Sequence, residues 1–114
     1  MDISAEGPDL APDWREAANN VYGVLRGRFS TSAVAERFVL AGWKSRPASW
    51  DAYEVETSWC RVDLAPVDGS DTLLNGVADP DKFDALAMLL SRFGLSFDLE
   101  LYDDEGGLLR EIAV

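Results

Sequence analysis

The sequence predicts an α+β domain: a mostly antiparallel sheet of about five strands, with an N-terminal helical hairpin and one further helix, in the order ααβββαββ. The spacing of apolar residues predicts the fold class, and the length and composition predict a single domain. Segments in which apolar residues recur every third or fourth position, as in helices, alternate with segments in which they recur every second position, as in strands. The chain has 114 residues, 47% of them hydrophobic, which fits a single domain spanning residues 1–114.

The N-terminal part predicts an arm followed by the helical hairpin. Residues 1–11 are polar and contain Gly and Pro, so we expect a loose arm there. The first helix is expected to begin at Asp13, where "DWRE" is typical of a capping box, and its apolar stripe includes Val21 and Leu25. The second helix is expected over residues 30–42, capped by a hydroxyl residue and closed by glycine.

Three strands are expected next, after a loop with the sequence "KSRPAS". The segments "WDAYEVET" and "WCRVDLAP" alternate polar and apolar residues, which is typical of strands with one buried face. "DTLLNGVA" predicts a third strand, and "VDGS" before it predicts a turn.

The strongest helix signal lies at residues 80–93. Asp79 is the expected N-cap and Pro80 the first helical residue, while Phe83 begins an apolar stripe with helical spacing. A final hairpin is expected from "LSFDLELY" and "GLLREIAV", joined by an acidic turn whose glycines allow positive φ angles.

The charge of the chain restricts its partners. Ten basic and 21 acidic residues give a formal net charge of −11, and there is no histidine. Direct binding to nucleic acid is disfavoured, because contacts with phosphates need Lys and Arg. A basic protein is the favoured partner, since complementary charge accelerates its capture. Solubility is an alternative explanation of the acidity.

Most enzymatic chemistries are disfavoured by the sequence. Without histidine, Ser–His, Cys–His and HExxH arrangements cannot form, and no glycine-rich nucleotide loop is present. Cys60 falls on the apolar side of its strand and is expected to be a small buried hydrophobe. "LYDDEGGLL" does not fit a calcium loop, because Leu101 or Tyr102 would occupy the first ligand position. We therefore expect no cofactor, no metal and no enzymatic activity.

The sequence also bears on location. The start "MDISAEGPDLAPDW" has neither the basic nor the apolar region of a signal peptide, and no apolar run is long enough for a membrane span. We therefore expect a cytoplasmic protein that does not contact membranes. Monomer and homodimer remain alternatives.

The remaining candidate function is binding through a surface. Acidic residues on the polar side of the expected strands, the acidic turn and two aromatic residues form the candidate partner-binding set. Its members are Glu54, Glu56, Asp98, Glu100, Tyr102, Asp103, Asp104, Glu105 and Trp50. An acidic surface around an aromatic anchor is what an inhibitor of a basic enzyme presents.

In its size, its acidity, its lack of catalytic groups and its α+β pattern, the chain resembles the small immunity proteins of bacterial toxin systems. The resemblance covers the whole chain in character and includes no specific motif. It implies an inhibitor that covers the active site or substrate groove of a toxin, often a basic nuclease, with carboxylates standing in for phosphates. Two alternatives are a phage-type DNA mimic that blocks a defence complex and an accessory subunit that acts through an apolar interface.

Overall fold

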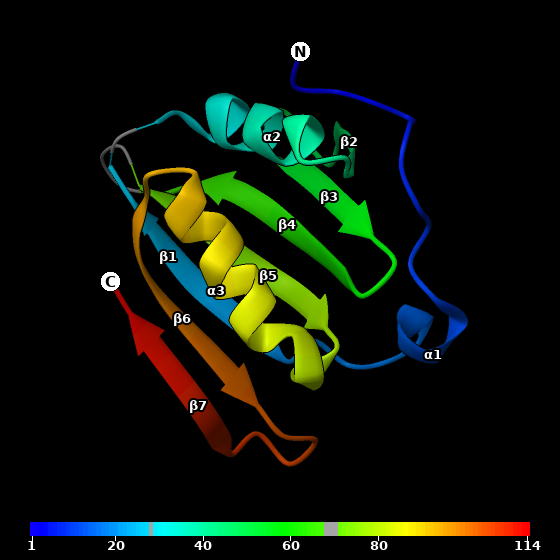
Figure 1. The fold of residues 1–114 in the computed structure, drawn as a ribbon, viewed down its shortest axis with the longest axis vertical. Coiled ribbons are helices and arrows are strands. Elements are labelled where there is room, and N and C mark those ends of the chain that lie inside the picture. Colours follow the sequence, from blue (N-terminus) through cyan, green and yellow to red (C-terminus); the bar gives the residue numbers. More distant parts are fainter. Residues whose placement is uncertain (28, 68–70) are drawn as a thin grey trace.

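The computed structural model describes residues 1–27, 29–67 and 71–114. Its sheet has seven antiparallel strands in the order β2-β3-β4-β5-β1-β6-β7 (Figure 1). The α+β class and the antiparallel sheet confirm the prediction, but the sheet is larger than expected. Of the expected N-terminal helical hairpin, the second helix is confirmed over Thr31–Leu40 with Ser30 as its N-cap, whereas the first was wrong, because Val21–Arg26 form a strand. The turn expected at residues 67–70 falls mostly outside the described residues.

In chain order the elements are α1 (Pro12–Arg15), β1 (Val21–Arg26), α2 (Thr31–Leu40), β2 (Lys44–Pro47), β3 (Tyr53–Thr57), β4 (Cys60–Pro66), β5 (Thr72–Ala78), a 3₁₀ turn η1 (Pro80–Lys82), α3 (Phe83–Arg92), β6 (Ser96–Tyr102) and β7 (Leu108–Ala113).

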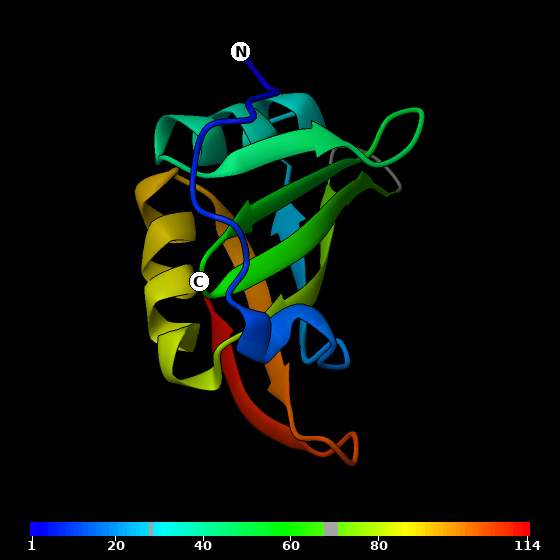
Figure 2. The same cartoon turned by 90° about the vertical axis from the view of Figure 1, so that its right-hand side faces the viewer.

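The two longer helices cover one face of the sheet. Helix α2 packs on β2, β3 and β4, and α3 packs on β6; Figure 2 shows both helices on the same side. Between the helices and the sheet lies the apolar core, whose largest fully buried side chains include Phe38, Phe83 and Phe97. The opposite side of the sheet is called the open face below.

Strand β1 corrects the expected first helix. Val21 and Leu25 are four residues apart, a spacing that fits one face of a helix and one face of a strand equally well. In the structure both side chains are buried on the helix-covered side, and β1 pairs with β5 and β6 in the interior of the sheet. At Gly23 a Cβ atom would lie 2.9 Å from Leu99 Cδ1, so the glycine leaves room for the Leu99 side chain of β6. Only residues 12–15 form a helix in this region, and Asp13 is not its N-cap.

Strand β2 corrects the expected loop. The polar segment Lys44–Pro47 pairs with β3 at one edge of the sheet. An edge strand has one unpaired side and tolerates both charged residues and proline, so its sequence lacks the alternation of a half-buried strand.

The predicted third helix is confirmed in its main features. The Asp79 side chain accepts a hydrogen bond from the Asp81 N–H, and Pro80 occupies the first position of a 3₁₀ turn that leads into α3. The apolar stripe is buried against the sheet, and Gly94 follows the helix with a φ of 81°. The hairpin of β6 and β7 after it also confirms the prediction.

The N-terminal segment, expected as a loose arm, is bound to the domain. Ser4 forms an antiparallel bridge with Ser45 of β2, with two backbone hydrogen bonds of 2.9 Å. The Asp2 carboxylate accepts hydrogen bonds from the Ser32 and Tyr53 hydroxyl groups. Leu10 is fully buried, so it anchors the end of the segment.

Candidate partner-binding surface

The open face of β6 carries three of the predicted site residues. Along this strand Phe97, Leu99 and Leu101 are buried under the helices, whereas Asp98, Glu100 and Tyr102 alternate with them and lie on the open face. This orientation follows from the alternation in "FDLELY" and was predicted from it.

Glu100 has a second glutamate directly opposite it. Glu100 of β6 is in register with Glu111 of β7. Phe97 and Val114 exchange both backbone hydrogen bonds, at 3.1 and 2.8 Å, and the two-residue alternation of an antiparallel ladder makes Glu100 and Glu111 a non-hydrogen-bonded pair. Side chains approach most closely at such pairs, where the Cα atoms are ~4.5 Å apart. Two like charges at this position destabilise the sheet.

Arginines on the two strands that flank β6 pair with acids other than Glu100 and Glu111. Arg110 lies on the helix-covered side, where it pairs with Asp84 at 2.7 Å and its guanidinium stacks over the Phe83 ring. Arg26 of β1 pairs with Asp98. Among the described residues, neither Glu100 nor Glu111 has a partner in an ion pair.

Tyr102 borders the two glutamates. Its hydroxyl donates a hydrogen bond of 3.0 Å to Glu100 Oε1. This hydrogen bond raises the pKa of the Tyr102 phenol, and partial desolvation and the negative charges of Glu100 and Glu111 raise it further. All of these causes favour the neutral phenol, so Tyr102 keeps its proton beside the two carboxylates.

These side chains line two neighbouring depressions on the open face. The first, called the acidic depression, has a volume of about 340 Å³ and is lined by Tyr22, Val24, Asp98, Glu100, Glu111 and Ala113. The second has a volume of about 260 Å³, and its lining includes Tyr22, Asn75, Tyr102, Asp103 and Asp104. Because Tyr22 lines both, the two depressions adjoin; together they are called the concave surface, which spans β1, β6 and β7.

The acidic tip, residues Asp103, Asp104 and Glu105, connects β6 to β7. Asp103 Oδ1 accepts hydrogen bonds from the backbone N–H groups of Glu105 and Gly107, at 2.9 and 2.7 Å, so this acid holds the turn. Gly106 has a φ of 84°, which explains the glycine. Asp104 and Glu105 are exposed, and among the described residues neither forms an ion pair.

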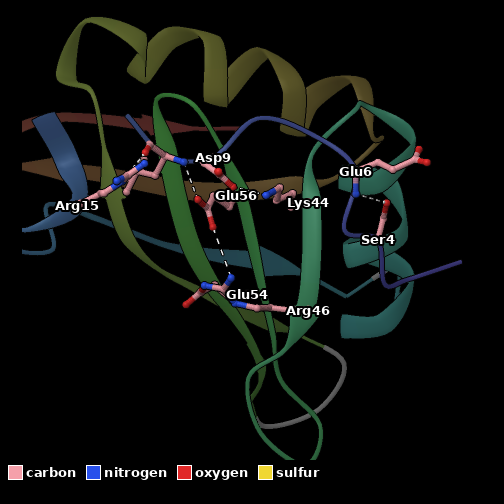
Figure 3. Close-up of polar contacts among 9 residues, drawn as sticks. Ser4, Glu6, Asp9, Arg15, Lys44, Arg46, Glu54 and Glu56 are labelled. Atoms are coloured by element: carbon pink, nitrogen blue, oxygen red, sulfur yellow. Dashed lines mark hydrogen bonds and ion pairs between the residues drawn. The ribbon is translucent and has the colours of Figure 1, made fainter. Parts of the chain in front are cut away.

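Glu54 and Glu56 lie elsewhere and are engaged within the protein (Figure 3). Both side chains point to the same side of β3, where Arg46 of β2 pairs with Glu54 and approaches Glu56 at 3.8 Å. Glu56 was expected in solvent but is only 7% exposed, and its Oε2 accepts a hydrogen bond of 2.6 Å from the Leu10 N–H. These two carboxylates therefore stabilise the domain and its N-terminal segment.

Trp50 is also separate from the acidic depression. It is 99% exposed in the loop between β2 and β3. Figure 2 shows this loop and the β6–β7 tip at opposite ends of the molecule. By contrast, Trp43 is buried and makes an edge contact with the partly buried Trp59, with ring centroids 5.4 Å apart.

Two residues of the surface were missed in the sequence. Tyr22 was assigned to a helix, although the sequence "VYGVLR" alternates buried and exposed positions as a strand does. Glu111 was placed in the last strand, but its position opposite Glu100 depends on a register that changes at a β-bulge next to Leu101 and Tyr102.

Cys60 and the acidic side chains bear on thiol and metal chemistry. Cys60 is fully buried, as predicted, and burial raises the pKa of its thiol, so the nucleophilic thiolate is disfavoured. The described part of the chain contains no cluster of three or more His, Cys, Asp or Glu side chains placed to hold a metal ion.

No family model matches the sequence, and neither a curated protein nor a solved structure matches it. Among the described residues, no helix has the length and apolar character needed to cross a membrane.

Proposed function

We propose that this protein is a non-catalytic inhibitor that binds a basic protein through the acidic depression and the acidic tip, and that it acts as an immunity protein against a bacterial toxin. The inhibitor covers the active site or substrate groove of the toxin. For a nuclease toxin, the carboxylates of the open face occupy the positions that substrate phosphates take.

The observation that carries this proposal is the pairing of Glu100 with Glu111. A like-charge pair at directly opposite positions costs stability in the free protein. A partner that places Lys or Arg between the two carboxylates removes this repulsion and gains two charge-assisted hydrogen bonds. The free energy that the pair costs in the free protein is therefore recovered on binding.

The residues around the pair fit a protein interface. Tyr22 and Tyr102 line the concave surface, and tyrosine is enriched in interfaces because its ring contributes apolar contact while its hydroxyl makes hydrogen bonds. The exposed acids Asp104 and Glu105 extend the negative surface beyond the depression. Charges at such a rim mainly increase the association rate.

The net charge supports rapid capture. With a formal net charge of −11, the chain attracts a basic protein from a distance comparable to the Debye length, ~8–10 Å near physiological salt. Association with the partner is therefore expected to slow steeply as salt is increased.

Affinity capture from the source organism tests the proposal. The wild-type protein is compared with Glu100→Lys/Glu111→Lys and with a charge-matched control, Glu6→Lys/Glu16→Lys, whose two exposed sites lie outside the acidic depression. We expect wild type and control to retain the same basic protein and the first variant to lose it. The purified captured protein should lose its activity when one equivalent of wild type is added. Retention that is equal for all three proteins, or an unaffected activity, would contradict the proposal.

One observation favours a second candidate, an accessory subunit that acts through an apolar interface. Trp50 is almost fully exposed, and solvent-exposed tryptophan is more typical of an interface than of free surface. Under this alternative, Trp50→Ser abolishes capture of the partner and Glu100→Lys/Glu111→Lys leaves it unchanged.

A further inference from the structure

Strand β7 forms an edge of the sheet and has unpaired backbone groups. The mutual hydrogen bonds of Phe97 and Val114 fix the phase of the ladder between β6 and β7. By alternation, the N–H and C=O groups of Ile112 point towards β6, and those of Glu111 and Ala113 point away from the sheet. Within the described residues, no strand pairs with this outer side.

The opposite edge of the sheet is protected differently. There Ser4 of the N-terminal segment pairs with Ser45 of β2 through two backbone hydrogen bonds of 2.9 Å. The chain thus covers part of one edge with its own extended segment. An uncovered edge strand is a ready template for pairing with another chain.

The two sides of β7 offer different chemistry to an added strand. On the open face, Glu111 lies in the acidic depression next to Glu100. On the helix-covered side, a groove of about 550 Å³ runs between α3 and β7, and its lining includes Ala87, Met88, Phe97, Ile112 and Val114. Met88 is 57% exposed in this groove. An added strand therefore meets an acidic side and an apolar side.

We infer that β7 is the docking edge for an extended segment of the basic partner, which adds to the sheet as an eighth strand. The segment alternates Lys or Arg with aliphatic residues, because successive side chains of a strand point to opposite sides. Its basic side chains lie beside Glu111 and Glu100, and its aliphatic side chains cover the groove beside α3. This inference rests on the proposed function and specifies the part of the partner that is recognised.

The charges at this edge favour a basic segment over a second copy of the chain as the added strand. Antiparallel pairing of two β7 strands keeps the open faces on one side, so both copies of Glu111 lie on the same side of the joined sheet. Each copy also has a net charge of −11. A basic segment relieves the repulsion between Glu100 and Glu111, whereas a second copy adds to it.

The test uses two peptides of the same composition. The probe is a capped peptide of about eight residues that alternates Val with Lys, a length within the usual range for a strand. The control contains the same residues as one block of Val followed by one block of Lys. We expect the alternating peptide to bind about tenfold more tightly and to slow amide exchange at Glu111 and Ala113, whose N–H groups point outward. The amide exchange rates of Arg110 and Ile112, whose N–H groups point towards β6, should change little.

A proline variant provides an independent measurement. Ala113→Pro removes one outward N–H without removing a bond to β6, and Ala113→Val is the matched control that keeps the N–H. We expect the proline variant to bind the alternating peptide about tenfold more weakly than Ala113→Val. The exchange data on the wild-type protein test the inference even if the proline variant is unstable.

Three outcomes would overturn the inference. If both peptides bind equally and the outward amides stay unprotected, the acidic surface acts without strand addition, and the proposed function survives. If the outward amides become protected with rising protein concentration alone, the edge belongs to a second copy. If neither peptide binds, β7 is not a docking edge. The proposed function fails separately, through the capture experiment with Glu100→Lys/Glu111→Lys.

Discussion

The Leu10 N–H donates a hydrogen bond of 2.6 Å to Glu56 Oε2, joining the N-terminal segment to a strand 46 residues later in the chain. Glu56 is buried, and its other carboxylate oxygen lies 3.8 Å from the Arg46 guanidinium. One carboxylate therefore satisfies a backbone donor and a cation at the same site, which explains why a charged group is tolerated there.

This relationship predicts the effect of substitutions at Glu56. Glu56→Ala leaves the Leu10 N–H without an acceptor in a buried position, and we expect a loss of about 1–3 kcal/mol in the free energy of unfolding. Glu56→Gln keeps an acceptor oxygen and should cost less. Urea denaturation followed by tryptophan fluorescence measures both. Equal losses in the two variants would show that the hydrogen bond to Leu10 contributes nothing.

Glu111→Gln is expected to stabilise the free protein. The substitution removes the repulsion between Glu100 and Glu111, and cross-strand pairs of this kind contribute about 0.2–1 kcal/mol. The gain should shrink as salt is added, because salt screens exposed charges. Glu105→Gln at the acidic tip removes one charge without a cross-strand partner and serves as the control in thermal unfolding. If the two variants have the same stability, the pair is not destabilising.

Tyr102 should titrate above its ordinary value of 10.0, because its hydrogen bond to Glu100 raises the pKa of the phenol. Glu100→Gln should move this pKa back towards 10.0, which ultraviolet absorbance of tyrosinate can follow. Tyr102→Phe identifies the signal among the three tyrosines. Since the raised pKa favours the neutral phenol in the folded state, Tyr102 contributes stability below pH 10.0, and this contribution is lost as the pH rises through the folded-state pKa. An unchanged titration in Glu100→Gln would contradict the assigned cause.

Asp2 is expected to make attachment of the N-terminal segment sensitive to acid. The hydrogen bonds from Ser32 and Tyr53 lower the pKa of Asp2 below its ordinary value of 3.8. Its contribution to stability is therefore complete above pH 3.8 and is lost as the pH falls through the lowered folded-state pKa. Comparing how the free energy of unfolding depends on acid pH in wild type and in Asp2→Asn isolates the contribution of Asp2. Parallel curves for the two proteins would show that Asp2 does not contribute.

The parts of the fold that the sequence predicts are those in which local pattern and tertiary environment agree. Phe83 to Leu90 in α3 and Phe97 to Leu101 in β6 have one buried side each, so their periods are unambiguous. Val21 and Leu25 lie in a central strand, but their spacing of four residues also suits a helix, and no local signal separates the two.

The candidate site was predictable to the same extent. The alternation of β6 places Glu100 on the open face, and the turn residues place the acidic tip. The burial of Glu56 depends on Leu10, which is distant in sequence, and the position of Glu111 depends on a bulged register. Both are set by contacts between segments that no local pattern encodes.

The place of β1 between β5 and β6 has a consequence for folding on the ribosome. Residues 21–26 are made early, but their two neighbours in the sheet are residues 72–78 and 96–102, so the emerging strand has no partner during most of synthesis. Contacts between such distant segments slow folding, since a long loop must close before either ladder can form. The concave acidic surface, which needs β1, β6 and β7 side by side, therefore cannot form until β6 and β7 have been synthesised.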